Sequence, residues 1–160
     1  MCLYSITQAS KSKSDCGYGW KVFLLVDGYR LRLPHQGTNT LIPTEVWIDE
    51  KDWRLERDPP VIRAEKYGLL HLHNFKGIST YLSGWHIFQS LTKARLWASE
   101  CTRVLPNNKS KYVIHKVIYQ SVRARGMQEV TLHGGERAKI IVSQLMYVCN
   151  ERREGKDDRI

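Results

Sequence analysis

Apolar and polar residues alternate with a period of two along several short stretches, which is typical of strands with one buried face. The clearest case is VFLLVDGYRLRL, whose second half alternates tyrosine or leucine with two arginines. The Asp27-Gly28 pair between the two halves tolerates the positive φ of a two-residue hairpin turn. We therefore expect a β-hairpin with residues 22–26 and 29–33 as its arms.

One stretch carries helical spacing instead. Within YLSGWHIFQSLTKARLWASE and the residues that follow it, apolar side chains recur at intervals of three or four: Leu91, Ala94, Trp97, Ala98 and Cys101. Ser90 precedes them as a suitable N-cap, and the PNN sequence from Pro106 ends the pattern. The sequence predicts a helix that begins after Ser90 and ends near Val104.

A short strand is expected immediately before this helix, at residues 85–88. Its alternation places Trp85 and Ile87 on one side and His86 and Phe88 on the other. We expect Trp85, together with Trp97, to anchor the helix on the sheet. His86 is interpreted as structural, with its ring packed on aromatic neighbours and one ring nitrogen on a backbone carbonyl. A role for His86 in a surface pocket is the alternative.

Other segments have two interpretations. Residues 111–122 and 138–148 fit a helical stripe, but their density of β-branched residues favours strands, with a turn at Arg125-Gly126 between them. Residues 44–60 fit a short strand or a helical turn, in which Trp47 and Trp53 are expected to be core anchors. Residues 1–17 are polar and are expected to end in a loop.

Together these elements predict an α+β fold, with an antiparallel sheet of roughly five to seven strands and one main helix packed on a face. Residues 1–150 are expected to form a single domain, followed by a charged tail at residues 151–160.

Charge gives the strongest functional signal. The chain has a net charge of +9, and residues 59–126 contain eleven Lys or Arg but two Asp or Glu. No acidic residue lies between Glu100 and Glu129. Such a field attracts polyanions or an acidic protein face, although net charge also serves solubility. The candidate binding residues are Lys93, Arg95, Arg103, Lys109, Lys111, Tyr112, Lys116, Tyr119, Arg123 and Arg125.

Other classes of protein find less support. No apolar run approaches the roughly 18 residues of a membrane span, and no signal peptide is visible, so we expect a cytoplasmic protein with free thiols and no membrane partner. His71 and His73 alternate on one strand face but lack a nearby Asp, Glu or Cys. We predict neither a metal nor a cofactor.

The segments GYGWKVF, SGWHIF with the following helix, and RAKIIVSQLMYV resemble a set of small phage and prophage proteins. Those proteins open with a GYKVF-like strand and carry a GFHIF or GFHSF strand before one helix; this chain has Trp85 where they usually have Phe. The resemblance implies a compact α+β domain of viral origin. It also implies a protein that binds and inhibits a host-defence (anti-CRISPR-like) complex in the bacterial cytoplasm.

The order of some polar residues also resembles the ADP-ribosyltransferases. Arg30 or His35, then Ser79, Thr80 and Tyr81, then Glu129 or Glu136 follow the order of that family's catalytic elements. The chain lacks the E-x-E motif, and Ser83-Gly84 interrupts the middle element.

We therefore expect a basic binding protein rather than an enzyme. Its partner would be an acidic protein surface or a host complex that contains nucleic acid. Direct binding of nucleic acid and an ADP-ribosyltransferase-like activity are the alternatives.

Overall fold

The fold is built mainly from one antiparallel sheet. The computed structural model describes residues 3, 5–9, 15–34, 41–53, 61–63, 80–82, 84–104, 111–131 and 135–150. The eight strands of the main sheet are β1 (Ser5–Ala9), β2 (Cys16–Val26), β3 (Arg30–Arg32), β4 (Leu41–Ile42), β5 (Trp47–Asp49), β8 (Trp85–Phe88), β9 (Lys111–Glu129) and β10 (Arg137–Val148).

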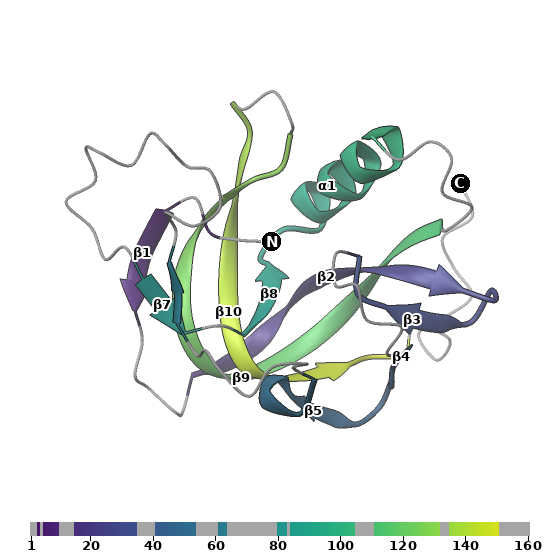
Figure 1. Ribbon diagram of the computed structural model, residues 1–160, viewed down its shortest axis with the longest axis horizontal. Coiled ribbons are helices and arrows are strands. Elements are labelled where there is room, and N and C mark those ends of the chain that lie inside the picture. The colour runs from purple at the N-terminus through teal and green to yellow at the C-terminus, as the bar shows by residue number, and fades with distance from the viewer. Residues whose placement is uncertain are drawn as a thin grey trace.

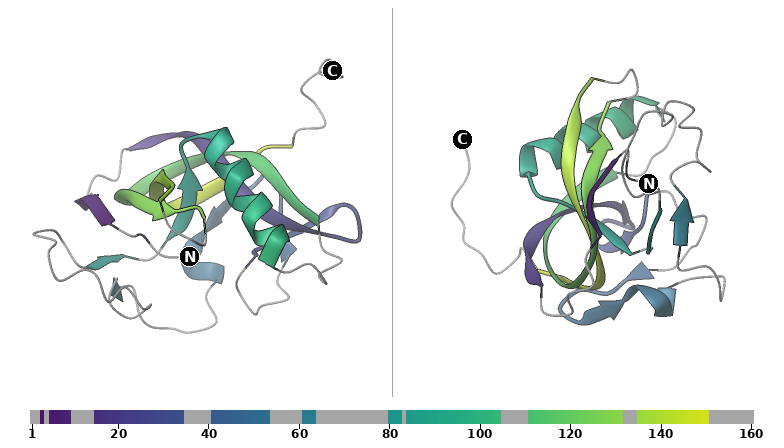
Figure 2. Two further views of the ribbon diagram at one scale, coloured as in Figure 1. Left: turned by 90° about the horizontal axis from the view of Figure 1, so that it is seen from above. Right: turned by 90° about the vertical axis from the view of Figure 1, so that its left-hand side faces the viewer.

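Two short strands, a 3-10 helix and one α-helix complete the described fold. Strands β6 (Val61–Arg63) and β7 (Thr80–Leu82) pair with each other in a separate two-stranded sheet. A 3-10 helix, η1 (Glu50–Trp53), follows β5 directly. Within the described residues there is one α-helix, α1 (Leu91–Val104), which crosses one face of the main sheet (Figures 1 and 2).

Four strands of the main sheet close on themselves. Strand β9 pairs with β10, β10 with β8, β8 with β2, and β2 again with β9. Figure 1 shows how strongly β9 and β10 curve to allow this closure. A register shift between Val142 and Ser143 and a positive φ of 60° at Ser121 mark an irregularity of the β9–β10 ladder. Such irregularities increase local bend and twist, which a sheet needs in order to curl.

The closed strands separate two hydrophobic clusters. The interior cluster includes Phe23, Trp85, Val117, Tyr119 and Met146, all less than 9% exposed. The second cluster lies between the sheet and α1.

In this second cluster, Trp97 of α1 packs on Phe88 of β8, with ring centroids 6.0 Å apart. The Ser90 hydroxyl accepts the backbone N–H of Lys93 (3.4 Å), which confirms the predicted N-cap and start of the helix.

The predicted alternation of β8 is confirmed, but the expectation that Trp85 anchors the helix on the sheet is wrong. Trp85 and Ile87 face the interior cluster, whereas Phe88 faces α1. Trp85 therefore packs on the opposite side of the sheet from the helix, where its indole N–H donates to the carbonyl of Ile48 (3.1 Å). Trp97 therefore anchors α1 on the sheet without a contribution from Trp85.

The hairpin prediction is confirmed. Asp27 and Gly28 have φ of 52° and 79°, and the Tyr29 N–H donates to the Val26 carbonyl (3.2 Å). The antiparallel sheet and the main helix are also as expected, but the sheet has eight strands rather than five to seven. The additional strands are short or lie at the edges of the sheet, where the sequence signal is weakest.

Residues 1–17, which were expected to end in a loop, also contain β1, which pairs with the end of β9. Two local expectations are wrong. Strand β9 runs through Arg125 and Gly126 without a turn, because Gly126 lies between β1 and β10. Trp47, expected in the core, is 49% exposed because it lies on the outward side of edge strand β5. The predicted tail, His35, His71 and His73 lie outside the described residues.

Candidate binding surface

Strands β2 and β9 share an outward face that α1 covers only in part. Along this face, Val22 lies opposite Ile114, and Leu24 lies opposite Tyr112. Val22, Ile114 and Tyr112 belong to the cluster beneath the helix. Farther along the strands, the same alternation brings Tyr18 and Ile118 to the outward face, where they are exposed.

These exposed side chains continue into a row across four strands. Tyr18 of β2 lies opposite Ile118 of β9, Ile118 lies opposite Tyr147 of β10, and Tyr147 lies opposite Trp47 of β5. We call these four residues the aromatic row. Tyr18 is 66% exposed, Ile118 38% and Trp47 49%, and Tyr147 is half-buried. The rings of Trp47 and Tyr147 are 5.7 Å apart between centroids.

The neighbouring positions of this face are partly apolar and carry one cation, Lys116, and one carboxylate, Asp49, which pairs with Lys51. Lys116 lies two residues before Ile118 on the same side of β9, and its ammonium lies 5.2 Å from the Tyr18 ring centroid. This distance is suitable for a cation–π interaction. In the described part of the chain, Lys116 has no ion pair. On the other side of the row, Gln120 lies opposite both Cys16 and Leu145.

Half of the eight predicted basic residues form ion pairs with the protein's own carboxylates. Nitrogen–oxygen distances are 2.6 Å for Lys93–Glu136, 3.0 Å for Arg103–Glu100, 3.2 Å for Arg123–Glu50 and 3.3 Å for Arg125–Asp15. Four of the ten candidates are thus partly neutralised. The long acid-free stretch in the sequence does not produce an equally long cationic surface, because distant segments supply the acids.

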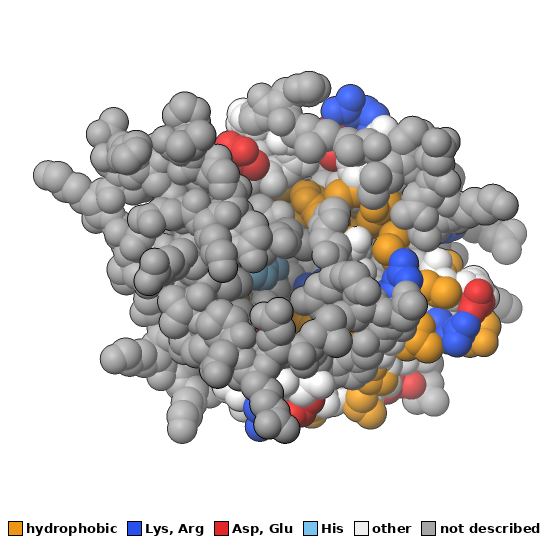
Figure 3. Space-filling view, in the orientation of Figure 1, with side chains coloured by type: hydrophobic (Ala, Val, Ile, Leu, Met, Phe, Trp, Pro, Cys, Tyr) orange, Lys and Arg blue, Asp and Glu red, His pale blue; other side chains and the backbone are white. Residues whose placement is uncertain are grey.

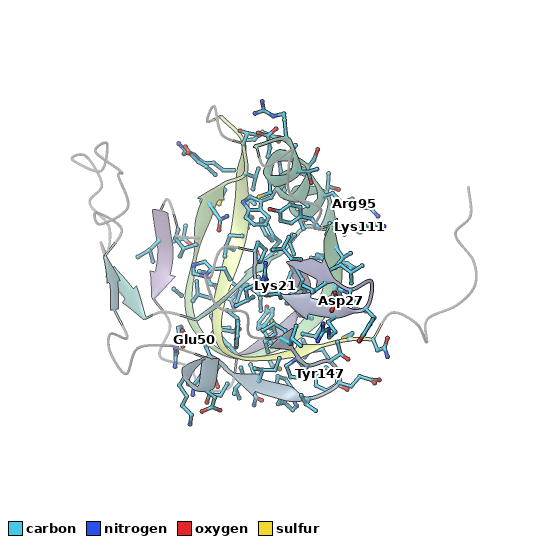
Figure 4. All side chains as sticks on the ribbon, turned by 45° about the vertical axis from the view of Figure 1, so that its right-hand side comes forward. Lys21, Asp27, Glu50, Arg95, Lys111 and Tyr147 are labelled. Carbon is cyan, nitrogen blue, oxygen red and sulfur yellow. The ribbon has the colours of Figure 1, made fainter. Side chains whose placement is uncertain are left out.

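The remaining candidates divide between surface and interior. Arg95 and Lys111 are exposed and lie at the same edge of the molecule, where α1 meets the start of β9 (Figure 4). Tyr119 is 6% exposed in the interior cluster, so it forms no part of a surface patch. Tyr112 packs beneath α1. Lys109 lies outside the described residues.

Among the residues that follow the ADP-ribosyltransferase order, those that the structure describes lie in or next to different strands. Arg30 pairs with Asp27 at the tip of the β2–β3 hairpin, beside the start of β9. Glu129 is the last residue of β9, and Glu136 pairs with Lys93 of α1. Tyr81 belongs to the separate β6–β7 sheet, and Ser79 lies outside the described residues.

Lys21 is an unusual residue that was not among the predicted site residues. Its side chain is 4% exposed, and its ammonium donates to the His86 carbonyl (3.0 Å) and lies 5.7 Å from the Trp85 ring centroid. Among the described residues it has no carboxylate partner. Burial lowers the pKa of Lys21 from 10.5 to about 7. The alternation of Lys21 with Phe23 and Leu25 in WKVFLLV was the available signal.

His86 matches its structural interpretation in one respect, the contact of a ring nitrogen with a backbone carbonyl. It is 6% exposed, and its Nδ1 lies 3.2 Å from the Gly84 carbonyl. Because a carbonyl only accepts, Nδ1 carries the proton in this hydrogen bond. Burial, and then the charge of Lys21, lower the pKa of His86 to about 3. The ring therefore stays neutral at physiological pH.

The described residues contain no group of three or more metal-ligating side chains and no helix long and apolar enough to cross a membrane. The described cysteines Cys16, Cys101 and Cys149 are free thiols. Comparison with known protein families found no matching family model, and comparisons with curated proteins and with solved structures also found no match.

Proposed function

We propose that the protein is a non-enzymatic binding protein that docks on an acidic protein surface through the aromatic row. The observation that carries this proposal is the row itself, because it places two tyrosines, a tryptophan and an isoleucine side by side on the outward face, three of them exposed and Tyr147 half-buried. Tyrosine and tryptophan are enriched among the residues that dominate the energy of protein–protein interfaces.

Charge complementarity indicates the chemistry of the partner. The chain has a net charge of +9, and Lys116 lies within the face next to Tyr18. An acidic partner would be attracted at long range and would pair with Lys116 on contact. A second copy of this chain would bring a like charge of +9 to the same contact, so self-association is disfavoured.

Direct nucleic-acid binding remains the second candidate, because bases stack on exposed aromatic rings. The aromatic row supplies such rings, but Lys116 is the cation that directly adjoins Tyr18. Nucleic-acid affinity depends mainly on multiple phosphate contacts. Four other predicted phosphate-binding residues are instead held in internal ion pairs. With one adjoining cation and four cations held in internal ion pairs, the surface favours a protein partner over nucleic acid. The phage resemblance further suggests a partner in a host-defence complex.

The test begins with nuclease-treated bacterial lysate passed over immobilised protein and over two variants, Trp47→Ala and Tyr29→Ala. Tyr29 is as exposed as Tyr18, at 66%, but it lies in the hairpin turn rather than in the row. A specific partner should be retained by the wild type and by Tyr29→Ala, and lost with Trp47→Ala.

The retained protein is then purified and its binding measured directly. Trp47→Ala should weaken the affinity by about 30-fold, as expected when an interface hot spot is truncated. Lys116→Met should mainly slow association and reduce its salt dependence. Equal binding by Trp47→Ala and the wild type would refute this use of the row. Tight, saturable binding to bare single-stranded DNA or RNA at physiological salt would favour the second candidate.

A further inference from the structure

A pocket opens at the end of the closed strands, on a different part of the surface from the aromatic row. It lies between the β2–β3 hairpin, the first half of β9 and the residues that follow β10, and its volume is about 460 Å³. Figure 3 shows hydrophobic side chains gathered beside basic and acidic ones near the hairpin at the right of the view. The lining residues are Leu25, Gly28, Tyr29, Leu31, Thr44, His115 and Asn150.

The pocket has an apolar part supplied by the hairpin. Leu31 is 3% exposed and Leu25 is partly buried against the interior cluster, so both are held firmly in place. Tyr29 is 66% exposed, and the Arg30 guanidinium lies 5.6 Å from its ring centroid. Two leucines and one aromatic ring form a surface suited to contact with a flat ring.

The opposite part of the pocket is polar and includes an oriented histidine. The His115 ring packs edge-on against Phe23, with centroids 5.9 Å apart, and its Nδ1 lies 3.3 Å from the Cys149 carbonyl. Because that carbonyl only accepts, Nδ1 carries the proton when this hydrogen bond forms. In the neutral ring, Nε2 is then left as an acceptor.

Two neutral polar side chains complete the lining. Thr44 contributes a hydroxyl, which both donates and accepts, and Asn150 contributes an amide. The Asn150 nitrogen donates to a Glu45 carboxylate oxygen at 3.5 Å, which orients the amide. Among the described residues that line the pocket, none is aspartate, glutamate, lysine or arginine. The pocket thus combines an apolar surface with uncharged donors and acceptors.

We propose that this pocket binds a neutral molecule of the nucleoside class, in which a flat heterocycle carries a hydrogen-bonding edge. The heterocycle contacts Leu25, Leu31 and the Tyr29 ring, and its donor faces Nε2 of His115. The volume lies within the range of roughly 300–1,000 Å³ that is usual for small-molecule sites. A phosphorylated ligand would bring charge that none of the described lining residues neutralises, and a purely apolar ring would leave the polar groups without partners.

The test uses calorimetric titration of the full chain with adenosine, guanosine, cytidine and uridine, with their 5′-monophosphates, and with indole as an apolar ring. At least one nucleoside should bind saturably and more tightly than its monophosphate and than indole. His115→Ala should weaken that binding about tenfold, which is the effect of one lost hydrogen bond at the upper end of its usual value. Thr44→Val should weaken it by a smaller factor.

Further variants test whether nucleoside binding takes place at this pocket and not elsewhere on the molecule. Tyr18→Ala, in the aromatic row, should leave nucleoside binding unchanged, and Thr44→Val provides an exposed variant that does not depend on the packing of His115. Nucleoside addition should also shift the imidazole resonances of His115 in NMR spectra. The proposal is overturned if no nucleoside binds, if a monophosphate binds more tightly than its nucleoside, or if both pocket variants bind as the wild type does.

Discussion

The outward face of the sheet has one part that α1 covers and another part that remains exposed to solvent. At one end of the outward face of β2 and β9, Val22 and Ile114 lie beneath α1. At the other end, Tyr18 and Ile118 follow the same alternation but remain in solvent. Both parts are rich in apolar side chains, so hydrophobicity alone does not distinguish them.

On this face, the length and position of α1 determine which apolar residues become core. The helix ends at Val104, and the elements nearest the uncovered part are β5 and β10, whose Trp47 and Tyr147 extend the row rather than bury it. A contiguous apolar patch left in solvent is typical of an interaction site. The covered part should therefore contribute to stability, and the uncovered part to binding.

The largest expected effect concerns the two tryptophans that represent these parts. Trp97→Ala should lower the free energy of unfolding by about 3–5 kcal/mol, because Trp97 is 7% exposed and packs on Phe88. Trp47→Ala should cost much less, because Trp47 is half in solvent. Urea denaturation of both variants measures the difference. Equal losses would show that the aromatic row is part of the core.

A second experiment compares the two sides of the sheet through Lys21 and Lys116. Because the folded-state pKa of Lys21 is about 7 and the reference value is 10.5, the unfolded chain binds the extra proton between these values. Stability should therefore rise with pH from about 7 to 10.5, by a few kcal/mol, and be independent of this group below about pH 7.

Lys21→Met should remove most of this rise and should stabilise the protein near neutral pH, because it replaces a buried amine by an apolar side chain of similar length. Lys116→Met is the matched control and should keep the rise, since Lys116 lies half-exposed on the outward side. Unfolding free energies measured across this pH range provide the test. An unchanged pH profile in Lys21→Met would show that Lys21 is not the titrating group.

A third, smaller effect tests whether the aromatic row is organised before any partner binds. The Trp47–Tyr147 pair should show a coupling energy of about 0.5–1.5 kcal/mol in a double-mutant cycle, as aromatic pairs at such distances do. Trp47→Ala, Tyr147→Ala and the double variant are compared by chemical denaturation. Additive effects would mean that the two rings do not support each other in the free protein.

The smallest expected effect concerns the ion pair between Lys93 and Glu136. Glu136→Gln should change stability by no more than about 1 kcal/mol, because the two side chains are 30% and 49% exposed and salt screens them. Thermal melts at low and high salt measure this change, which should shrink as salt increases. A much larger loss would indicate that this pair holds α1 against the β9–β10 end of the sheet.

Several elements were predictable because short-range chemistry determines them. The Asp27-Gly28 hairpin depends on two residues that tolerate positive φ, and the start of α1 depends on the Ser90 hydroxyl. The strand at residues 85–88 was recognisable from its alternation. In each case the information lies within a few neighbouring residues, so the rest of the fold adds little.

The candidate site was less predictable, because it depends on strand register. Tyr18, Ile118 and Tyr147 are about 100 and 30 residues apart along the chain and become neighbours only through pairing. The basic stretch predicted a binding surface in another part of the chain, and the sequence did not show that Glu50 and Asp15 come from distant segments to pair with Arg123 and Arg125. Sequence spacing carries no information about such long-range partners.

The Asp27-Gly28 hairpin, the start of α1 at Ser90 and the excess of positive charge follow from the sequence alone. Long-range pairing and packing determine that Gly126 continues a strand, that Lys21 points inward and that Trp47 points outward. Alternation assigns residues to two sides of a strand but does not say which side will be covered. Closure of β2, β8, β9 and β10 and the placement of α1 make that choice, and with it they separate the core from the surface left for binding.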